Sequence, residues 1–165
     1  MHEYSIRPFC SADWPGVEKI LTEAVAEGNA TFRSRVPAFD EWNKSHYPFA
    51  RLTAQKSGLV AAWAALSYMK VGCSSEGLGE VSIYIAQEHQ RRGLGRKLLL
   101  DLRKEAFENG LWTLHSVIMS DNIPSIELHK NCGFRIVGEC EKISKDISGK
   151  WRNIIIMESR HKEND

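Results

Sequence analysis

The sequence predicts one mixed α/β domain in which helices cover both faces of a single sheet. The first observation is the order of the expected elements, β-α-α-β-β-β-α-β-α-β-β. This order is neither a strict alternation of strands and helices nor a run of strands followed by a run of helices. The second observation is that 165 residues without internal repeats or low-complexity linkers have the length of one domain and can bury a core. We therefore expect residues 1–165 to form a single domain.

The first half of the chain carries patterns for three strands and two helices. Residues 4–7 are expected to form the first strand. Residues 11–27 are expected to form a helix, because apolar side chains recur on one face and Gly28-Asn29 follows them as a stop signal. A short helix is expected over residues 38–46. Residues 49–55 and 59–68 are expected to pair as a hairpin, and residues 71–79 to form a loop.

The second half begins with an alternating apolar strand over residues 81–85, which Glu80 precedes. A helix is expected from Leu94 to Asn109-Gly110, because leucines recur there at helical spacing. A strand over 113–119 and a short helix follow; Asn122 or Asp121 is the expected N-cap of this helix. Two last strands, over residues 134–145 and 151–159, flank a turn at Ser148-Gly149.

The most informative stretch is Gln90-Arg91-Arg92-Gly93-Leu94-Gly95-Arg96, which lies between the strand over residues 81–85 and the long helix. A strand that turns through two glycines into a helix directs several free backbone N–H groups at one point. The helix dipole and three arginines add positive potential there. The pattern therefore predicts a cradle for the pyrophosphate of a cofactor.

Two common phosphate-binding loops do not match this stretch. A P-loop closes with Gly-Lys-Ser/Thr, whereas Arg96-Lys97-Leu98 offers no hydroxyl for a magnesium ion. A dinucleotide-binding turn has a third glycine at the position where this chain has Leu98. The remaining alternative to a cofactor cradle is an ordinary strand–helix connection with surface arginines.

The stretch resembles the Gln/Arg-x-x-Gly-x-Gly/Ala signature of the GNAT family of acetyl-CoA-dependent N-acetyltransferases. Residues 120–134, in which a short helix runs into Gly133-Phe134, resemble the second signature of that family. The resemblance spans essentially the whole chain. It implies a central mixed, mostly antiparallel sheet that is splayed in the middle. Further matches to the branch that acetylates phosphinothricin or methionine sulfoximine are Ala30-Thr31-Phe32, Glu80, Leu128-His129, Gly149-Lys150-Trp151-Arg152-Asn153 and Met157.

The resemblance assigns the groups that hold acetyl-CoA. Backbone N–H groups of the glycine turn face the pyrophosphate, and main-chain groups of the splayed strand pair with the pantetheine arm. Asn122 and Asn131 match positions that contact the cofactor in the branch, although both also fit the ordinary role of a helix-end residue. The cofactor-binding residues implied in this way are Ile83, Tyr84, Ile85, Arg91, Arg92, Gly93, Leu94, Gly95, Arg96, Asn122 and Asn131.

Two residues match the catalytic positions of the branch. Glu80 corresponds to its glutamate base, and a partly buried carboxylate accepts a proton more readily at neutral pH; the alternative is a solvated glutamate beside a glycine-rich loop. His129 stands where most GNAT enzymes have a tyrosine that protonates the thiolate. An imidazole can donate a proton near neutral pH, or it only shapes the pocket. Tyr84 and Tyr68 are alternative donors.

The acceptor pocket is implied to be framed by Phe32, Lys70, Val81 and Ser82. Lys70, Arg33 or Arg35 has the charge to attract a carboxylate or phosphinate, and each of the three also fits a simple surface cation.

Composition excludes several other classes. The chain has 22 Lys and Arg against 21 Asp and Glu, a formal net charge of +1, so it has no basic footprint for nucleic acid. No apolar run approaches the roughly 20 residues that span a bilayer, and the first residues do not read as a secretory signal. The cysteines and histidines show no metal-binding spacing. We expect a cytoplasmic protein with reduced thiols, no metal and no membrane partner; the resemblance implies a homodimer.

The sequence therefore predicts an acetyl-CoA-dependent N-acetyltransferase. Its expected acceptor is the amine or imine nitrogen of a small amino-acid analogue of the phosphinothricin or methionine sulfoximine type, with direct transfer and a glutamate general base. One alternative is a GNAT enzyme that acts on a protein N-terminus or a lysine. Another is a CoA-binding regulatory module without turnover, and a nucleotide-binding protein is disfavoured because the lysine–hydroxyl pair is missing.

Overall fold

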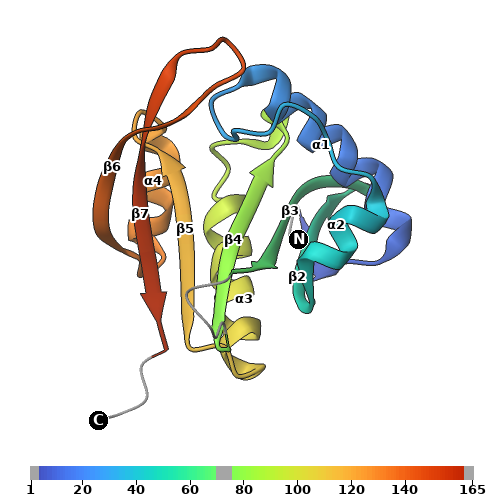
Figure 1. Ribbon diagram of the computed structural model, residues 1–165. Coiled ribbons are helices and arrows are strands. Elements are labelled where there is room, and N and C mark those ends of the chain that lie inside the picture. The colour runs from blue at the N-terminus through green and yellow to red at the C-terminus, as the bar shows by residue number, and fades with distance from the viewer. Residues whose placement is uncertain (1–3, 70–75, 162–165) are drawn as a thin grey trace.

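The computed structural model describes residues 4–69 and 76–161, and its strands form one seven-stranded sheet with helices on both faces (Figure 1). In chain order the elements are β1 (Ser5–Pro8), the 3-10 turn η1 (Ser11–Asp13), α1 (Trp14–Glu27), α2 (Phe39–Ser45), β2 (His46–Lys56), β3 (Leu59–Tyr68), β4 (Leu78–Ile85), the 3-10 turn η2 (Gln87–His89), α3 (Leu94–Glu108), β5 (Thr113–Met119), α4 (Ile123–Asn131), β6 (Arg135–Lys145) and β7 (Trp151–Arg160).

The strand order is β1-β2-β3-β4-β5-β7-β6. Every neighbouring pair is antiparallel except β4 and β5, which are parallel. A parallel pair needs a long crossover connection, and α3 supplies it between β4 and β5. The predicted fold class, a mixed and mostly antiparallel sheet between helices, is confirmed.

The face covered by α3 and α4 holds the larger part of the core. The leucines that predicted α3 are buried, and Leu98, Leu99 and Leu102 have no exposed surface. They pack against alternate residues of β3 and β4 and against residues of β5 and α4. Because side chains alternate along a strand, the same strands present their other residues to the opposite face.

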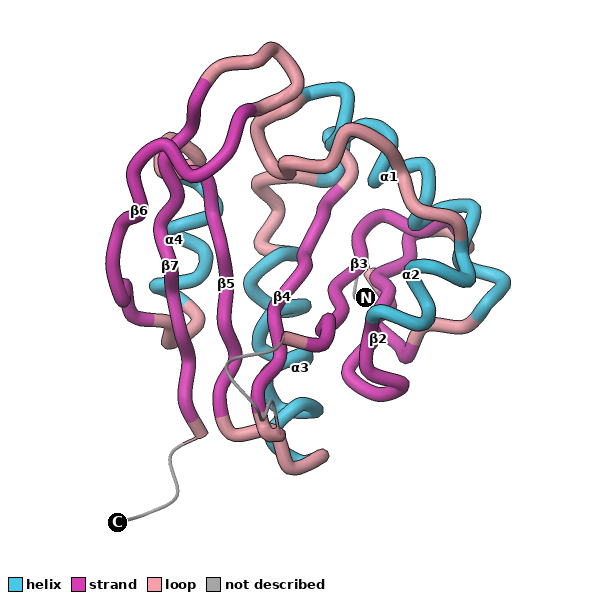
Figure 2. Tube along the Cα trace, in the orientation of Figure 1, coloured by secondary structure: helices cyan, strands magenta, loops and turns pink. Residues whose placement is uncertain are grey.

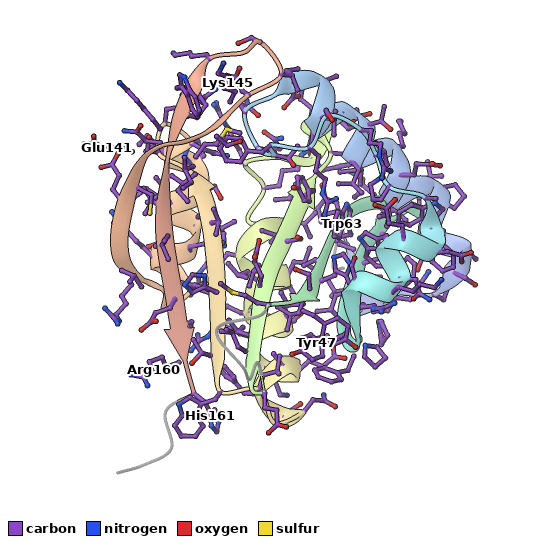
Figure 3. All side chains as sticks on the ribbon, in the orientation of Figure 1. Tyr47, Trp63, Glu141, Lys145, Arg160 and His161 are labelled. Atoms are coloured by element: carbon purple, nitrogen blue, oxygen red, sulfur yellow. The ribbon has the colours of Figure 1, made fainter. Side chains whose placement is uncertain are left out.

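The opposite face is covered by α1 and α2. There, Trp63 of β3, labelled in Figure 3, packs in a second apolar cluster with Val17 of α1 and Trp42 of α2. Its ring stacks on Tyr84 of β4 with the centroids 5.0 Å apart. Tyr84 therefore points toward α1, whereas Val81 belongs to the cluster beneath α3. The alternation therefore determines which β4 side chains face α3 and which face α1.

Most element boundaries follow the sequence patterns, with three corrections. The expected helix over residues 11–27 begins as a 3-10 turn, in which Asp13 accepts hydrogen bonds from the backbone N–H of Cys10 and the guanidinium of Arg7. The expected loop over residues 71–79 ends too late, because β4 already begins at Leu78; residues 70–75 lie outside the described part.

The third correction concerns β2, which begins at His46 inside the expected helix over residues 38–46. The register to β3 shifts between His46 and Arg51, so Pro48 lies in an irregular part of the strand. Proline is tolerated there because no regular ladder bond needs its missing N–H. In the described part of the chain, no helix has the length and apolar character needed to cross a membrane.

Candidate active site

β4 and β5 form a fork in the middle of the sheet. Their ladder contains only three residue pairs and ends at Glu80 and His115. Beyond this point β4 stays paired with β3, while β5 stays paired with β7. Figure 2 shows the two strands diverging from their common end. The segment of β4 from residue 81 to 85 therefore presents main-chain groups that the β4–β5 ladder does not use, which is the splay that the resemblance implied.

A pocket of about 800 Å³ fills the fork and extends to both faces of the sheet. It takes its walls from β4, β5, α1, α4 and the glycine turn. The lining residues are Ile20, Glu23, Ala24, Glu27, Ala30, Thr31, Phe32, Arg33, Ser67, Glu80, Val81, Ser82, Ile83, Tyr84, Ile85, Gln87, Gln90, Arg91, Gly93, Gly95, Arg96, Ser116, Val117, Ile118, Met119, Asn122, Pro124, Ser125, Leu128 and His129.

The glycine turn lies at one end of this pocket and has the features of an anion cradle. Gly93 is the N-cap of α3 with φ +75°, and because it has no side chain it does not cap the N–H groups of the first turn. A Cβ built on Gly93 meets no protein atom within 4 Å. A Cβ on Gly95, in contrast, would lie 2.8 Å from the Cδ1 of Ile85. The turn thus keeps open space above uncapped helix N–H groups, as an anionic group requires.

The charged residues of the predicted cradle differ in where they lie. Arg91 and Arg96 line the pocket, and Arg91 itself has a positive φ of +59°. Arg92 and Leu94 are not among the lining residues, and Leu94 is buried in the core. The side chain of Gln90 donates from Nε2 to the carbonyl of Ile85 at 3.2 Å, which joins the turn to the end of β4.

Glu80 lies at the vertex of the fork and lines the pocket. It is paired with Ser67 of β3. Because every second residue of a strand lies on the same face, its side chain shares the α1 face with those of Ser82 and Tyr84. Burial raises the pKa of the Tyr84 phenol, which also forms a side-chain hydrogen bond with Thr31. Tyr68 is exposed and does not line the pocket; its ring is tilted against that of Tyr47, with the centroids 4.2 Å apart.

His129 reaches the pocket from α4 on the other face. Its Nε2 lies 3.0 Å from the Oγ of Ser116, and its Nδ1 lies 2.8 Å from the carbonyl oxygen of Ser125. Burial lowers the pKa of the imidazole. His129 is therefore held as a neutral ring between a strand hydroxyl and a helix carbonyl.

Comparison with known proteins agrees with this geometry. The family model described as the acetyltransferase (GNAT) family matches residues 14–134. The chain belongs to the GNAT family. It is 29% identical over 161 residues to the L-methionine sulfoximine/L-methionine sulfone acetyltransferase of Pseudomonas paraeruginosa, a match that covers 93% of this chain and 92% of the relative. It is 30% identical over 139 residues to the phosphinothricin N-acetyltransferase of Streptomyces viridochromogenes, covering 81% and 75% of the two chains.

Among solved structures, yncA of Salmonella typhimurium, determined with its cofactor acetyl-CoA, superimposes with a TM-score of 0.90 at 26% identity and covers 98% of this chain and 96% of its own. These findings confirm that this GNAT protein is an acetyl-CoA-dependent N-acetyltransferase with acetyl-CoA as co-substrate. The uncapped N–H groups of α3 and the open space above Gly93 fit the pyrophosphate of that co-substrate.

The predicted acceptor residues are brought together only in part. Phe32, Val81 and Ser82 line the pocket, and so does Arg33. Arg35 is engaged elsewhere, since its guanidinium donates two hydrogen bonds to the carboxylate of Glu41. Lys70 lies outside the described residues.

Of the two asparagines that match cofactor positions of the GNAT branch, one lines the pocket and the other does not. Asn122 is the N-cap of α4 and lines the pocket; its side chain accepts from the N–H of Ser125 and donates to the carbonyl of Asn29 at 3.4 Å. Asn131 is an exposed residue at the last turn of α4 and is not among the lining residues.

Sequence reasoning missed several lining residues of the GNAT pocket. Ser116 is the most informative, because it lies on β5 between the buried Leu114 and Ile118 and shares their face. A polar residue at an inward position of an apolar strand is a signal that the sequence did contain. Glu23 and Glu27 of α1 and Ser67 of β3 were missed as well, and their positions depend on tertiary packing alone.

Proposed function

We propose that this acetyltransferase transfers the acetyl group to the amine or imine nitrogen of a small amino-acid analogue of the methionine sulfoximine or phosphinothricin type, with Glu80 as general base. The observation that carries the proposal is the place of Glu80. It lies at the vertex of the fork, on the α1 face of a pocket that continues to the glycine turn. A carboxylate at the vertex lies where a nitrogen entering from the α1 side would meet a thioester held in the fork.

The glycine turn and β4 are the proposed holders of acetyl-CoA. The N–H groups of the first turn of α3 and the side chains of Arg91 and Arg96 would bind the pyrophosphate. The main-chain edge of Ile83, Tyr84 and Ile85, which the β4–β5 ladder leaves free, would hold the pantetheine arm. None of these contacts needs a protonation change, so they supply orientation and leave proton transfer to other groups.

Glu80 would act on the ammonium form of the acceptor. An amine is protonated at neutral pH and has no lone pair with which to attack a carbonyl carbon. A carboxylate within reach of the ammonium, directly or through one water, removes this proton and releases the nucleophile. The neutral amine then attacks the thioester carbon, the C–S bond breaks, and the thiolate leaves.

The acceptor side of the pocket suits a compact zwitterion. The α1 end and the segment after it, including Glu27, Thr31 and Arg33, wall the pocket. The contact between Asn122 and Asn29 ties this segment to the start of α4. Of the two candidate arginines near this wall, Arg33 lines the pocket and would bind an acceptor carboxylate, whereas Arg35 is committed to Glu41. The relatives named for methionine sulfoximine and phosphinothricin act on acceptors of this size and charge.

The test is a panel of acceptors at equal concentration, followed by release of CoA. The panel contains methionine sulfoximine, phosphinothricin, free lysine and a lysine-containing peptide with a free N-terminus. We expect kcat/KM for the two analogues to exceed that for the peptide by at least two orders of magnitude. A preference for the peptide would support the N-terminus or lysine alternative, and absence of turnover with every amine would support a CoA-binding module.

A further inference from the structure

One register row of the sheet carries a polar side chain on each of six strands. Residues that are paired in neighbouring strands place their side chains on the same face of a sheet, and this row lies on the α1 face together with Glu80. Across the sheet from β2 to β6, the row consists of His46, Ser67, Glu80, His115, Glu158 and Arg135. It therefore connects the proposed general base with the edge strand β6.

His115 is the member of this row that lies next to Glu80 and outside the pocket. The two residues form the last pair of the β4–β5 ladder, and neighbouring strands lie about 4.8 Å apart. A hydrogen bond through one water can therefore join the carboxylate to the imidazole. Ser67 and Glu80 line the pocket, whereas His115 does not. The imidazole thus reaches the base from a side that neither substrate would occupy.

The ring of His115 combines a buried nitrogen with access to solvent. Its Nδ1 is buried, and in the described part of the chain no polar atom lies within hydrogen-bond distance of it. The residue as a whole is only half-buried. Figure 1 shows α1 and α2 over the half of the sheet that carries β2 and β3, with β5 and β7 open to the viewer. Nδ1 is therefore free to accept a proton when the ring hydrogen is on Nε2.

The charged groups around His115 favour a transient imidazolium. In the row, Glu80 lies on one side of it and Glu158 on the other. Arg135 donates to Glu158 from Nε and Nη2, and both hydrogen bonds end on Oε1, so this ion pair does not use Oε2. Arg160 of β7 lies one diagonal position away on the same face. The carboxylates are thus the direct neighbours of the imidazole, and both cations lie farther away, which favours a positive charge on the ring.

We propose that His115 is the outlet through which Glu80 loses the proton that it takes from the acceptor ammonium. This inference rests on the proposed function, in which Glu80 is the general base. The proton passes from the carboxyl group of Glu80 through one water to Nδ1 of His115, and the imidazolium releases its Nε2 proton to solvent. Glu80 is then a carboxylate again and His115 a neutral ring, and exchange with water returns the ring hydrogen to Nε2.

The outlet is useful because the bound substrates occupy the pocket side of Glu80. A base that keeps its proton cannot accept the next one, and its direct route to bulk water closes while acetyl-CoA and the amine fill the pocket. An imidazole takes up and releases protons near neutral pH, so it can empty the base between turnovers. His115 acts through Glu80 and touches neither substrate, which makes it a positioning residue for the proton path.

Three variants test the outlet with whichever amine the wild type acetylates fastest. His115→Ala removes the imidazole, and His115→Gln keeps a hydrogen-bonding group that carries no proton. Thr113→Ala is the matched control, because Thr113 lies on the same strand and face, is also half-buried and does not line the pocket. In weak buffer, kcat of both His115 variants should fall about tenfold or more, less than the about 10²- to 10⁴-fold for losing a base. KM and acetyl-CoA affinity should change by less than threefold, and Thr113→Ala should match the wild type.

Free imidazole in the buffer gives a readout that a purely structural role would not move. It should return kcat of His115→Ala to within about threefold of wild type and leave Thr113→Ala unchanged, because it replaces only a missing proton carrier. A deficit that imidazole does not relieve would overturn the outlet, as would full activity in His115→Gln. Nitrogen-15 NMR of the wild type should show a neutral His115 with its hydrogen on Nε2; a hydrogen found on Nδ1 would also contradict the proposal.

Glu80→Gln separates this result from a failure of the proposed function. In the Glu80→Gln background, adding His115→Ala should lower kcat no further, because no proton reaches the imidazole. A slow Glu80→Gln variant together with a His115→Ala variant of normal kcat would overturn the outlet alone. A Glu80→Gln rate near that of the wild type would overturn the general base, and the outlet with it.

Discussion

Gly28 at the end of α1 lies against Ile147 in the turn between β6 and β7: a Cβ built on Gly28 would lie 3.0 Å from the Cγ1 of Ile147. Gly28 follows α1, which packs on β3, whereas Ile147 lies in the turn between β6 and β7, the two strands beyond β5. The turn and the segment after α1 meet across the open end of the fork (Figure 1). Gly28 also has φ +67°, so it reverses the chain and directs the next residues along the pocket.

We predict that Ile147→Ala loosens the wall formed by the segment after α1. The ratio of kcat/KM for a bulky amine over methionine sulfoximine should rise by about an order of magnitude. Ile143→Ala is the control, because Ile143 on the same hairpin is equally exposed, 54% against 53% for Ile147. Equal ratios in the two variants would show that the Gly28 contact does not limit acceptor size.

A second prediction separates backbone strain from cofactor binding at the glycine turn. Gly93 and Gly110 have similar positive φ values, +75° and +85°, and a Cβ on either meets no protein atom within 4 Å. Alanine at either site should therefore cost about 1 kcal/mol of stability. Only Gly93→Ala should weaken acetyl-CoA binding, by at least about tenfold in calorimetry, because its methyl group occupies the space above the helix N-terminus. Equal acetyl-CoA affinities would remove the turn from the cofactor site.

Glu80→Gln tests the general base. The amide keeps the size of the side chain but accepts no proton at neutral pH, so kcat at pH 7 should fall about 10²- to 10⁴-fold. Acetyl-CoA affinity should stay unchanged, and part of the rate should return at high pH, where free amine is abundant. Glu88→Gln, at an exposed carboxylate outside the pocket, is the control. A Glu80→Gln rate near that of the control would assign Glu80 to pocket shape only.

Arg33 and Arg35 form a matched pair for the acceptor carboxylate. Arg33→Gln should raise KM for methionine sulfoximine about ten- to a hundredfold, the range of one hydrogen bond to a charged group, with kcat little changed. Arg35→Gln should leave both constants within twofold, because Arg35 binds Glu41 away from the pocket. Initial-rate kinetics at saturating acetyl-CoA measures both, and identical KM values in the two variants would contradict the assignment.

The last prediction concerns acid stability. Burial lowers the pKa of His46 from 6.5 to about 4, and its Nδ1 donates to the carbonyl of Trp42. The unfolded chain binds this proton more tightly than the folded one, so His46 lowers the free energy of unfolding as pH falls from 6.5 to 4. The full loss is about 3 kcal/mol. Urea unfolding of His46→Asn should show a shallower pH dependence over this interval; an unchanged slope would assign the acid sensitivity to other groups.

Local patterns were sufficient for the fold but not for the walls of the pocket. Alternation and helical spacing predicted the β-strands and α-helices of the described residues to within a few positions. The spacing of Gly93 and Gly95 between a strand and a helix predicted where the glycine turn lies. The start of β2 at His46 was not predicted, because Pro48 reads as a strand breaker but lies in an irregular part of the strand between His46 and Arg51. Glu23 joins the pocket through the packing of α1 across the sheet, and no local pattern reports such a distance. Local patterns also could not tell whether Arg33 or Arg35 faces the pocket, because that depends on how the segment after α1 packs.

The two ends of the fork are held by interactions of different strength: backbone pairing at one end and loop contacts at the other. At one end three ladder pairs join β4 to β5. At the other end, the connections among the described residues include the 3.4 Å hydrogen bond from Asn122 to Asn29 and the contact of Gly28 with Ile147. Widening the pocket at the sheet end breaks backbone pairing, whereas widening it at the loop end costs little. Under the proposed function, we therefore expect substitutions in these surface loops to change the size of the accepted amine while the sheet and the glycine turn stay as they are. Acceptor choice and acetyl-CoA binding would then vary independently of each other.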